Sequence, residues 1–372
     1  MNSLRIGIAG AGLLGRLAAW TLARQGHEVS VFDPAPDAGP RHDGQGAAGF
    51  TAAGMLSPVA ERETATAALA DLGWTSIAHW GRVAQHLEAT TPLIHTRGSL
   101  LVAHGPDLGT ARRVLARLNP SPGSQTPPPR HEPHLLDVQA LGQLEPALHS
   151  SGGPLHAWLL PGEAHIDTVR TLVALQTQAR GVHWHWGQRV IELTAGALTT
   201  QAVDHGGHSP PRRHTFDLVW DLRGTGAKEA CAVRGVRGEL VWLQAPGLGL
   251  QRPIRLLHPR HRVYIVPRPD DVVLVGASEV ESEDRSPMSL RSAVELMAAA
   301  HSVLPALAEA RILKLDVNLR PALPDHHPQV QVEPGLIRIN GLYRHGWLLA
   351  PALLSQALQQ AGLRSLLNET TP

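Results

Sequence analysis

The first 33 residues contain two short apolar runs separated by one longer segment with helical spacing. Arg5 to Ala9 and Val29 to Phe32 are the apolar runs, and both are typical of buried strands. The segment between them stops at Gly26. One face of that segment carries small or mostly apolar residues at helical spacing, namely Leu14, Leu17, Ala18, Thr21 and Leu22. The pattern predicts strand, helix and strand, the beginning of an α/β fold with a parallel sheet.

A glycine-rich turn connects the first predicted strand to the helix. Gly10, Gly12 and Gly15 form a G-x-G-x-x-G, and Asp33 follows the second strand. Gly10 permits the tight turn, Gly12 lets the backbone approach a pyrophosphate, and Gly15 lets helix and strand pack closely. The helix N-terminus offers unpaired N–H groups to phosphates. Because turn, helix and acid all occur at the expected spacing, the sequence predicts a dinucleotide site.

Further along the chain, the apolar pattern changes to short runs with β-branched residues, at 98–103, 239–244, 262–267 and 272–275. Helices are predicted at 167–180 and 289–301, and the end returns to strand and helix. Loops rich in proline, glycine or histidine are expected at 119–134 and 205–214. We therefore expect an α/β, Rossmann-like dinucleotide domain interleaved with an α+β substrate domain on a mainly antiparallel sheet. The predicted dinucleotide domain comprises 1–85, 150–232 and 311–372, and the substrate domain 86–149 and 233–310.

Composition limits the classes of function. With 33 basic and 32 acidic residues, the net charge of +1 gives no electrostatic reason to bind nucleic acid or an anionic membrane. The single cysteine, Cys231, excludes an intramolecular disulfide and suits a reducing cytoplasm. No apolar run approaches the roughly 18 residues of a membrane span, and we expect no signal peptide. The 22 histidines lack metal-ligand spacing, so no metal site is expected.

The interleaved domains bear on the identity of the dinucleotide. A nicotinamide dehydrogenase would normally continue its parallel sheet through several more βαβ units. This chain instead leaves for an antiparallel region and closes on a C-terminal strand and helix. That organisation favours a flavin buried between two domains, with a nicotinamide enzyme kept as a weaker alternative.

Several stretches resemble the D-amino-acid-oxidase-like flavoproteins, and most closely the glycine oxidases of thiamine biosynthesis. They occur in the family's order along nearly the whole chain. VYIVPR, LRPALPD and the terminal YR-x-G-WLLAP are the more specific ones. The stretches are GAGLLG (10–15), AAGMLSP (52–58), VRGELVWL (236–243), VYIVPR (263–268), LVGAS (274–278), LRPALPD (319–325) and LYRHGWLLAP (342–351).

The resemblance implies non-covalent FAD and indicates which residues contact it. The turn at 10–15 would hold the pyrophosphate and residues 33–34 would flank the ribose. Residues 53–55 would line the isoalloxazine, residues 342–348 would run along it, and the backbone of Val190 would meet the adenine. The implied cofactor-binding residues are Gly10, Gly12, Leu13, Leu14, Gly15, Asp33, Pro34, Ala53, Gly54, Met55, Val190, Gly224, Leu342, Tyr343, Arg344, His345, Gly346, Trp347 and Leu348.

Three residues match substrate-binding positions of the family. Arg320 would hold the substrate carboxylate through its planar guanidinium, Tyr264 would add a hydroxyl donor, and Arg344 would be a second arginine beside the flavin. A surface salt bridge for Arg320 and a core position for Tyr264 are the ordinary alternatives. The chain departs from the family's frequent residues at Phe50 and around Arg344, which leaves substrate size and flavin-site polarity open.

The resemblance implies an FAD-dependent oxidase of glycine or another small amino acid. The α-carbon would transfer a hydride to flavin N5, with oxygen as acceptor and hydrogen peroxide as product. The imine would give glyoxylate and ammonia from glycine, or supply thiamine thiazole formation. No catalytic acid or base is required of the protein. The alternatives are a D-amino-acid or sarcosine oxidase or dehydrogenase of the same fold, and a non-catalytic flavin-binding protein. A homo-oligomer is compatible with the sequence.

Overall fold

The computed structural model describes residues 3–63, 66–118, 132–148, 155–203, 209–258 and 262–368. Most of the predicted loop at 119–134 lies outside these residues. So does part of the loop at 205–214, whose last residues belong to a strand, β12 (Arg212–Thr215).

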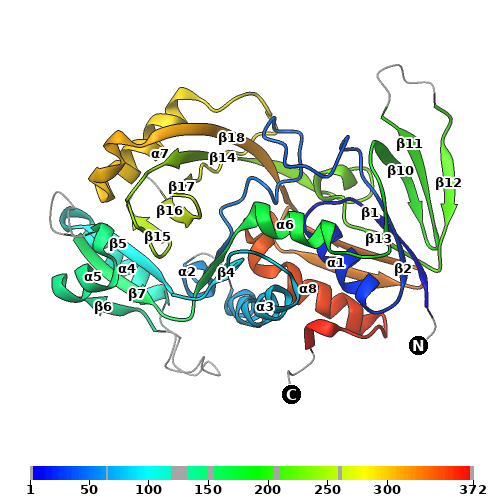
Figure 1. Ribbon diagram of the computed structural model, residues 1–372, viewed down its shortest axis with the longest axis horizontal. Helices are drawn as coiled ribbons and strands as arrows, with labels where there is room; N and C mark the ends of the chain where they lie inside the picture. Colours follow the sequence, from blue (N-terminus) through cyan, green and yellow to red (C-terminus); the bar gives the residue numbers. More distant parts are fainter. Residues whose placement is uncertain are drawn as a thin grey trace.

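A six-stranded, mostly parallel sheet carries the N-terminal strand, turn and helix (Figure 1). β1 (Arg5–Ala9) lies inside it and pairs in parallel with β2 (Glu28–Phe32) and β13 (Leu218–Asp221). Helix α1 (Leu13–Arg24) connects β1 to β2, as the periodicity predicts. In sheet order the strands are β19 (Gln329–Glu333), β20 (Leu336–Asn340), β13 (Leu218–Asp221), β1 (Arg5–Ala9), β2 (Glu28–Phe32) and β9 (Val182–His185).

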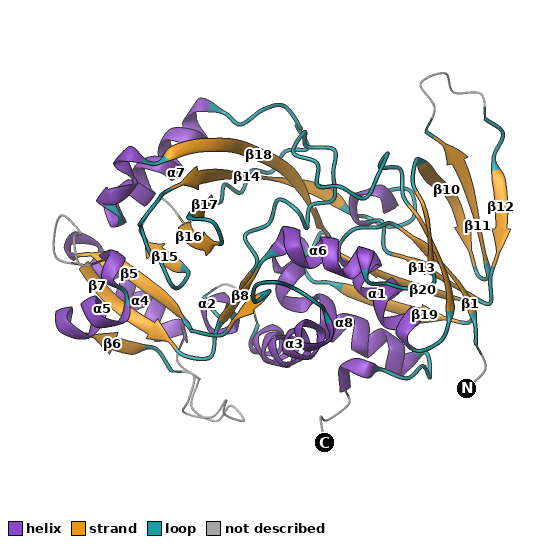
Figure 2. Cartoon of the chain, in the orientation of Figure 1, coloured by secondary structure: helices purple, strands orange, loops and turns teal. Residues whose placement is uncertain are grey.

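Each face of this sheet is covered by a different layer (Figure 2). Ile6, Ile8 and Trp220 pack with α1 and three further helices in the largest core cluster. Phe32 and Val219 pack on the other face against a small antiparallel sheet. The further helices are α3 (Ala67–His86), α6 (Thr168–Thr177) and α8 (Gly346–Gln360), and the small sheet consists of β10 (Gln188–Thr194), β11 (Ala197–Ala202) and β12.

An eight-stranded, mainly antiparallel sheet forms the other half of the molecule (Figure 1). One face packs against α5 (Val138–Leu144) and α7 (Leu290–Val303). Part of the opposite face packs against α4 (Leu108–Leu118), and Trp242 and Val266 on that face contact Ala53. In sheet order the strands are β18 (Arg311–Ala322), β14 (Arg234–Gln244), β17 (Val272–Gly276), β16 (Arg262–Arg268), β15 (Ile254–Leu257), β5 (Ser99–His104), β7 (Leu155–Leu160) and β6 (His134–Leu136).

Short elements join the two halves. Helix α2 (Pro58–Glu61) follows β3 (Met55–Leu56), a strand of a three-stranded sheet. The remaining strands of that sheet are β8 (Ala164–Ile166) and β4 (Ile94–His95). The 3-10 turns are η1 (Gly105–Asp107), η3 (Pro146–Leu148), η4 (Gly224–Ala227), η5 (Pro305–Glu309), η6 (Tyr343–His345) and η7 (Leu366–Asn368).

Two strands belong to a different sheet from the one that the predicted domain division implies. β18, placed by the sequence with the dinucleotide segments, pairs along its length with β14. β7, also placed there, pairs with β5. Both belong to the eight-stranded sheet. The sequence does not show this, because an apolar run predicts a strand but not the strand with which it pairs. We propose the same two interleaved domains, with β7 and β18 on the substrate side.

Candidate active site

A cavity of about 890 Å³ lies between the six-stranded and eight-stranded sheets. Gly10, Asp33 and Leu222 line one side, and each directly follows a parallel strand. Tyr264 and Arg320 line the other side from β16 and β18. Ligands of open α/β sheets bind at the carboxyl ends of the strands, and this volume is in the range of ligand-binding pockets.

The glycine-rich turn follows β1 closely. Gly10 has φ +99°, and a Cβ there would lie 2.7 Å from the carbonyl oxygen of Leu222. A Cβ on Gly15 would lie 1.9 Å from the carbonyl oxygen of Gly10, so Gly15 packs the helix onto the turn. A Cβ on Gly12 would meet only Ala47, at 3.8 Å. The space at Gly12 therefore belongs to the cavity, beside the N-terminus of α1.

Asp33 directly follows β2 and lies beside this turn. Its two oxygens accept the N–H groups of Ala11 and Ala35, at 2.6 and 2.8 Å. A carboxylate has about four acceptor positions, so Asp33 retains capacity for ribose hydroxyls. The neighbouring Arg16 was not singled out from the sequence, although it directly follows the G-x-G-x-x-G. It is 2% exposed, donates to the carbonyls of Ala11 and Leu172, and burial lowers its pKa to about 10, opposed by the charge of Asp33.

The end of β13 supplies a second turn to the cavity. Gly224, with φ +55°, begins η4 shortly after this strand. Arg223 pairs with the buried carboxylate of Asp221 at 2.7 Å and also donates to the carbonyl of Val190 at 3.2 Å. Val190 thus lines the cavity with its carbonyl already engaged, and its contact with adenine stays a proposal.

Arg320 presents a guanidinium to the cavity without a carboxylate partner among the described residues. It donates to two backbone carbonyls, those of Ser278 and Arg237. Tyr264 lines the same region. Burial raises the pKa of its phenol, while the charges of Arg320 and Arg268 and a hydrogen bond with Arg320 oppose that rise. Both predicted carboxylate-binding residues therefore lie together in the cavity.

Arg344 also lines the cavity, but acidic side chains surround it. Its guanidinium lies 3.2 Å from Glu61 and 3.8 Å from Glu279. Both carboxylates line the cavity and neither was predicted from the sequence. No local pattern marks them, because the three residues come from α2, the segment after β17 and η6. Arg344 is thus less available to a substrate carboxylate than Arg320.

Three predicted cofactor residues do not line the cavity: Gly15, His345 and Leu348. Gly15 acts by packing, as described above. His345 is 5% exposed, and its Nδ1 lies 3.4 Å from Glu61. Leu348 is part of the main core. The positions of the last two follow from η6 and α8, in which neighbouring side chains point in different directions.

The residues present fit FAD. A small-residue turn and a helix N-terminus suit the pyrophosphate, with an acid beside them for the ribose. The cavity continues from there to Ala53, Gly54 and Leu342, where the backbone or small side chains leave room for a flat ring. No helix within the described residues is both long and apolar enough to cross a membrane.

Comparisons with known proteins show the fold and the family of the chain. The chain is 36% identical over 359 residues to the putative thiamine biosynthesis oxidoreductase ThiO of Rhizobium etli, covering 96% of both chains. It is 28% identical to the bifunctional protein ThiO/ThiG of Synechocystis, of which it covers 48%. The crystal structure of glycine oxidase from Geobacillus kaustophilus has the same fold, with a TM-score of 0.76 at 22% identity, covering 98% of this chain and 96% of that one. The DAO family of FAD dependent oxidoreductases matches residues 5–356, and the chain belongs to that family.

Proposed function

We propose that this FAD-dependent enzyme oxidises glycine or another small amino acid to the corresponding imino acid. The observation that carries the proposal is Arg320, a cationic side chain in the cavity with no carboxylate partner among the described residues. The relatives named as a ThiO oxidoreductase and as a glycine oxidase support the same substrate class.

The side chains of the cavity bind and orient the substrate. Arg320 binds the carboxylate, and the hydroxyl of Tyr264 donates to it. When bound, FAD would accept the hydride of the Cα–H bond, that is two electrons and one hydrogen, as the Cα–N bond becomes a double bond. Gly346 at the start of α8 lines the cavity, so the positive end of this helix stabilises negative charge nearby. The protein thus contributes orientation and electrostatics rather than an acid or base.

We further propose that oxygen reoxidises the enzyme and yields hydrogen peroxide, and that FAD is held without a covalent bond. Glycine would give glyoxylate and ammonia after the imine hydrolyses. Alternatively, the imine would enter thiazole formation in thiamine biosynthesis, the process named for the Rhizobium relative. Both products follow from the same oxidation.

An anaerobic screen of the FAD-loaded protein with glycine, sarcosine and D-amino acids tests the proposed activity. We expect glycine or another small amino acid to bleach the flavin absorbance. Bleaching only by larger D-amino acids would favour the D-amino-acid oxidase alternative. If no amino acid bleaches the flavin, the protein is not an amino acid oxidase.

The role of Arg320 is tested by R320L. Because a charge-assisted bidentate pair is lost, KM for the amino acid should rise by about two orders of magnitude or activity should disappear. The FAD content, measured from flavin absorbance after denaturation, should remain that of the parent. Loss of FAD would instead show that Arg320 supports the cofactor.

A further inference from the structure

Three consecutive residues of β14 divide between the two faces of the eight-stranded sheet. Gly238 lines the cavity, whereas Glu239 lies on the other face beside Ser289, the N-cap of α7. Successive side chains of a strand point to opposite faces, so Arg237 shares the face of Glu239. A Cβ on Gly238 would lie 2.4 Å from Cζ of Arg320, so the guanidinium lies directly on the glycine.

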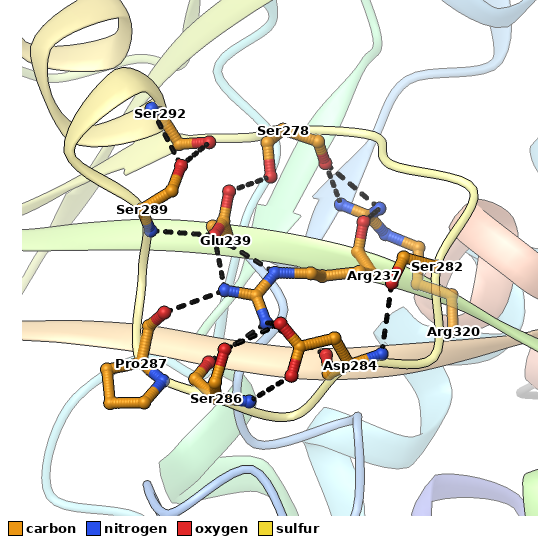
Figure 3. Close-up of polar contacts among 10 residues, drawn as sticks. All are labelled: Arg237, Glu239, Ser278, Ser282, Asp284, Ser286, Pro287, Ser289, Ser292 and Arg320. Carbon is orange, nitrogen blue, oxygen red and sulfur yellow. Dashed lines mark hydrogen bonds and ion pairs between the residues drawn. The ribbon is translucent and has the colours of Figure 1, made fainter.

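On the far face, Arg237 and Glu239 form a buried ion pair (Figure 3). The two side chains are 6% and 1% exposed. Arg237 donates from Nε and Nη2 to Glu239 Oε1, at 3.1 and 2.7 Å. It donates further to the carbonyls of Asp284, Ser286 and Pro287, at 2.8 to 2.9 Å. All five N–H donors of this guanidinium are therefore used, and they hold the segment after β17 against β14.

The same network continues to Arg320 through Ser278 (Figure 3). The Ser278 hydroxyl donates to Glu239 Oε2 at 2.7 Å. The Ser278 carbonyl accepts from Nη1 and Nη2 of Arg320, both at 3.1 Å. The carbonyl of Arg237 accepts a longer bond from Nη1, at 3.4 Å.

These contacts determine which edge of the Arg320 guanidinium remains available. The carbonyls engage the Nη1–Nη2 edge and the outer side of Nη1. Among the described residues, Nε and the outer N–H of Nη2 have no carbonyl or carboxylate partner. The other group that hydrogen-bonds to this guanidinium is the hydroxyl of Tyr264, the second residue proposed to bind the substrate carboxylate. Nε and the outer N–H of Nη2 form one parallel edge, which matches the two oxygens of a carboxylate.

The electrostatics of the network favour a permanent ion pair. Burial alone would raise the pKa of Glu239. Hydrogen bonds from serine side chains and from Arg237 outweigh burial and hold the pKa below its ordinary value. Glu239 is thus ionised at neutral pH and neutralises the buried charge of Arg237, so it leaves the charge of Arg320 on the cavity face of the sheet uncompensated.

We propose that Arg237 and Glu239 are positioning residues that aim the Nε–Nη2 edge of Arg320 at the substrate carboxylate, with Gly238 as the surface on which the guanidinium rests. They act through the carbonyl of Ser278 and the backbone of Arg237 and do not touch the substrate. The inference rests on the proposed role of Arg320. Its physical basis is preorganisation: a long, flexible side chain fixed before binding loses less conformational entropy on binding.

The test compares E239Q with E145Q in FAD-loaded enzyme. Glu145 is also a fully buried carboxylate paired with an arginine, Arg252 at 3.3 Å, but it accepts from the N–H of Gln251 instead of from Ser278. The probe is acetate, a carboxylate without an amine, whose binding is followed through the visible flavin spectrum. E239Q should raise the Kd of acetate and KM for the amino acid about tenfold, with kcat changed less than twofold. E145Q should lower Tm and leave the Kd of acetate unchanged.

Two further variants distinguish a failure of the proposed network from a failure of the proposed role of Arg320. S278A removes only the hydroxyl link to Glu239 and should raise the Kd of acetate about threefold, even if E239Q does not fold. R320L should abolish acetate binding. If R320L weakens acetate binding but E239Q and S278A do not, the network is only structural support and the inference is wrong. If R320L binds acetate like the parent, the proposed role of Arg320 fails, and the inference with it.

Discussion

Gly12 and Gly15 lie three residues apart in one turn, but a side chain at each position would meet different surroundings. At Gly15 a Cβ would overlap the carbonyl oxygen of Gly10, at 1.9 Å, whereas at Gly12 it would project into the cavity. G15A should therefore destabilise the fold by several kcal/mol or prevent folding, since backbone would have to move. G12A should keep Tm of the apoprotein within a few degrees but lose FAD. Thermal unfolding and flavin content separate the two, and a stable, FAD-loaded G15A would contradict this account.

The roles of single residues were predictable where a local motif dictates them. The three turn glycines and Asp33 occur at fixed spacing, and the structure places them around one turn. Glu61 and Glu279 were not predictable, because their relation to Arg344 exists only after distant segments fold together. The R-G-E triplet of β14 lies in a stretch that resembles the family. Which face of the sheet each of its side chains occupies was not predictable, because that depends on the register of β14 with β18.

At the scale of elements, α8 has a proline inside it and a compensating contact from another helix. Pro351 has no N–H to donate to the carbonyl of Trp347, four residues earlier. The indole of Trp80 in α3 donates to this carbonyl instead, at 2.7 Å. The helix begins at Gly346, so Pro351 lies beyond its first turn. Proline usually marks the first turn of a helix, and the compensating donor lies 267 residues away.

This arrangement predicts a coupling between Trp80 and Pro351. W80F leaves a buried carbonyl without its donor and should lower the free energy of unfolding by about 1–3 kcal/mol. In a P351A background the helix backbone itself can supply the missing N–H, so the same W80F change should cost about 1 kcal/mol less. Urea unfolding of the four proteins in this cycle measures the difference. An equal cost of W80F in both backgrounds would show that packing alone accounts for the effect of Trp80.

At the scale of the whole molecule, side chains that cross between the two halves fix the cavity walls. His42, in the segment after β2, lies 3.0 Å from Asp316 of β18, and Asn318 of the same strand donates to the carbonyl of Gly46 at 3.1 Å. Glu163 makes a comparable junction elsewhere in the fold. It is fully buried and accepts the N–H groups of Val59 and Ala60 in α2, at 2.9 and 3.0 Å, and the hydroxyl of Ser99 in β5 at 2.5 Å.

The Glu163 junction should make stability depend on pH. Burial raises the pKa of Glu163 to about 7, against the opposing hydrogen bonds, from an ordinary value of 4.5. Between these two pH values the folded protein retains a proton that the unfolded chain has released, so stability falls as pH rises. E163Q mimics the protonated acid, because its amide can accept the same two N–H groups. Its advantage over the parent should be absent below pH 4.5, grow up to pH 7, and then level off at up to about 3 kcal/mol.

Urea unfolding of both proteins from pH 4.5 to 8 measures that difference directly. Buried His165, whose pKa burial lowers to about 3, contributes an opposite slope below pH 6.5, because only the unfolded chain is then protonated. This slope is common to parent and E163Q and cancels when they are compared at each pH. A difference that stays constant over the whole range would mean that Glu163 titrates alike in the folded and unfolded protein, and that the junction between α2 and β5 holds a permanent carboxylate.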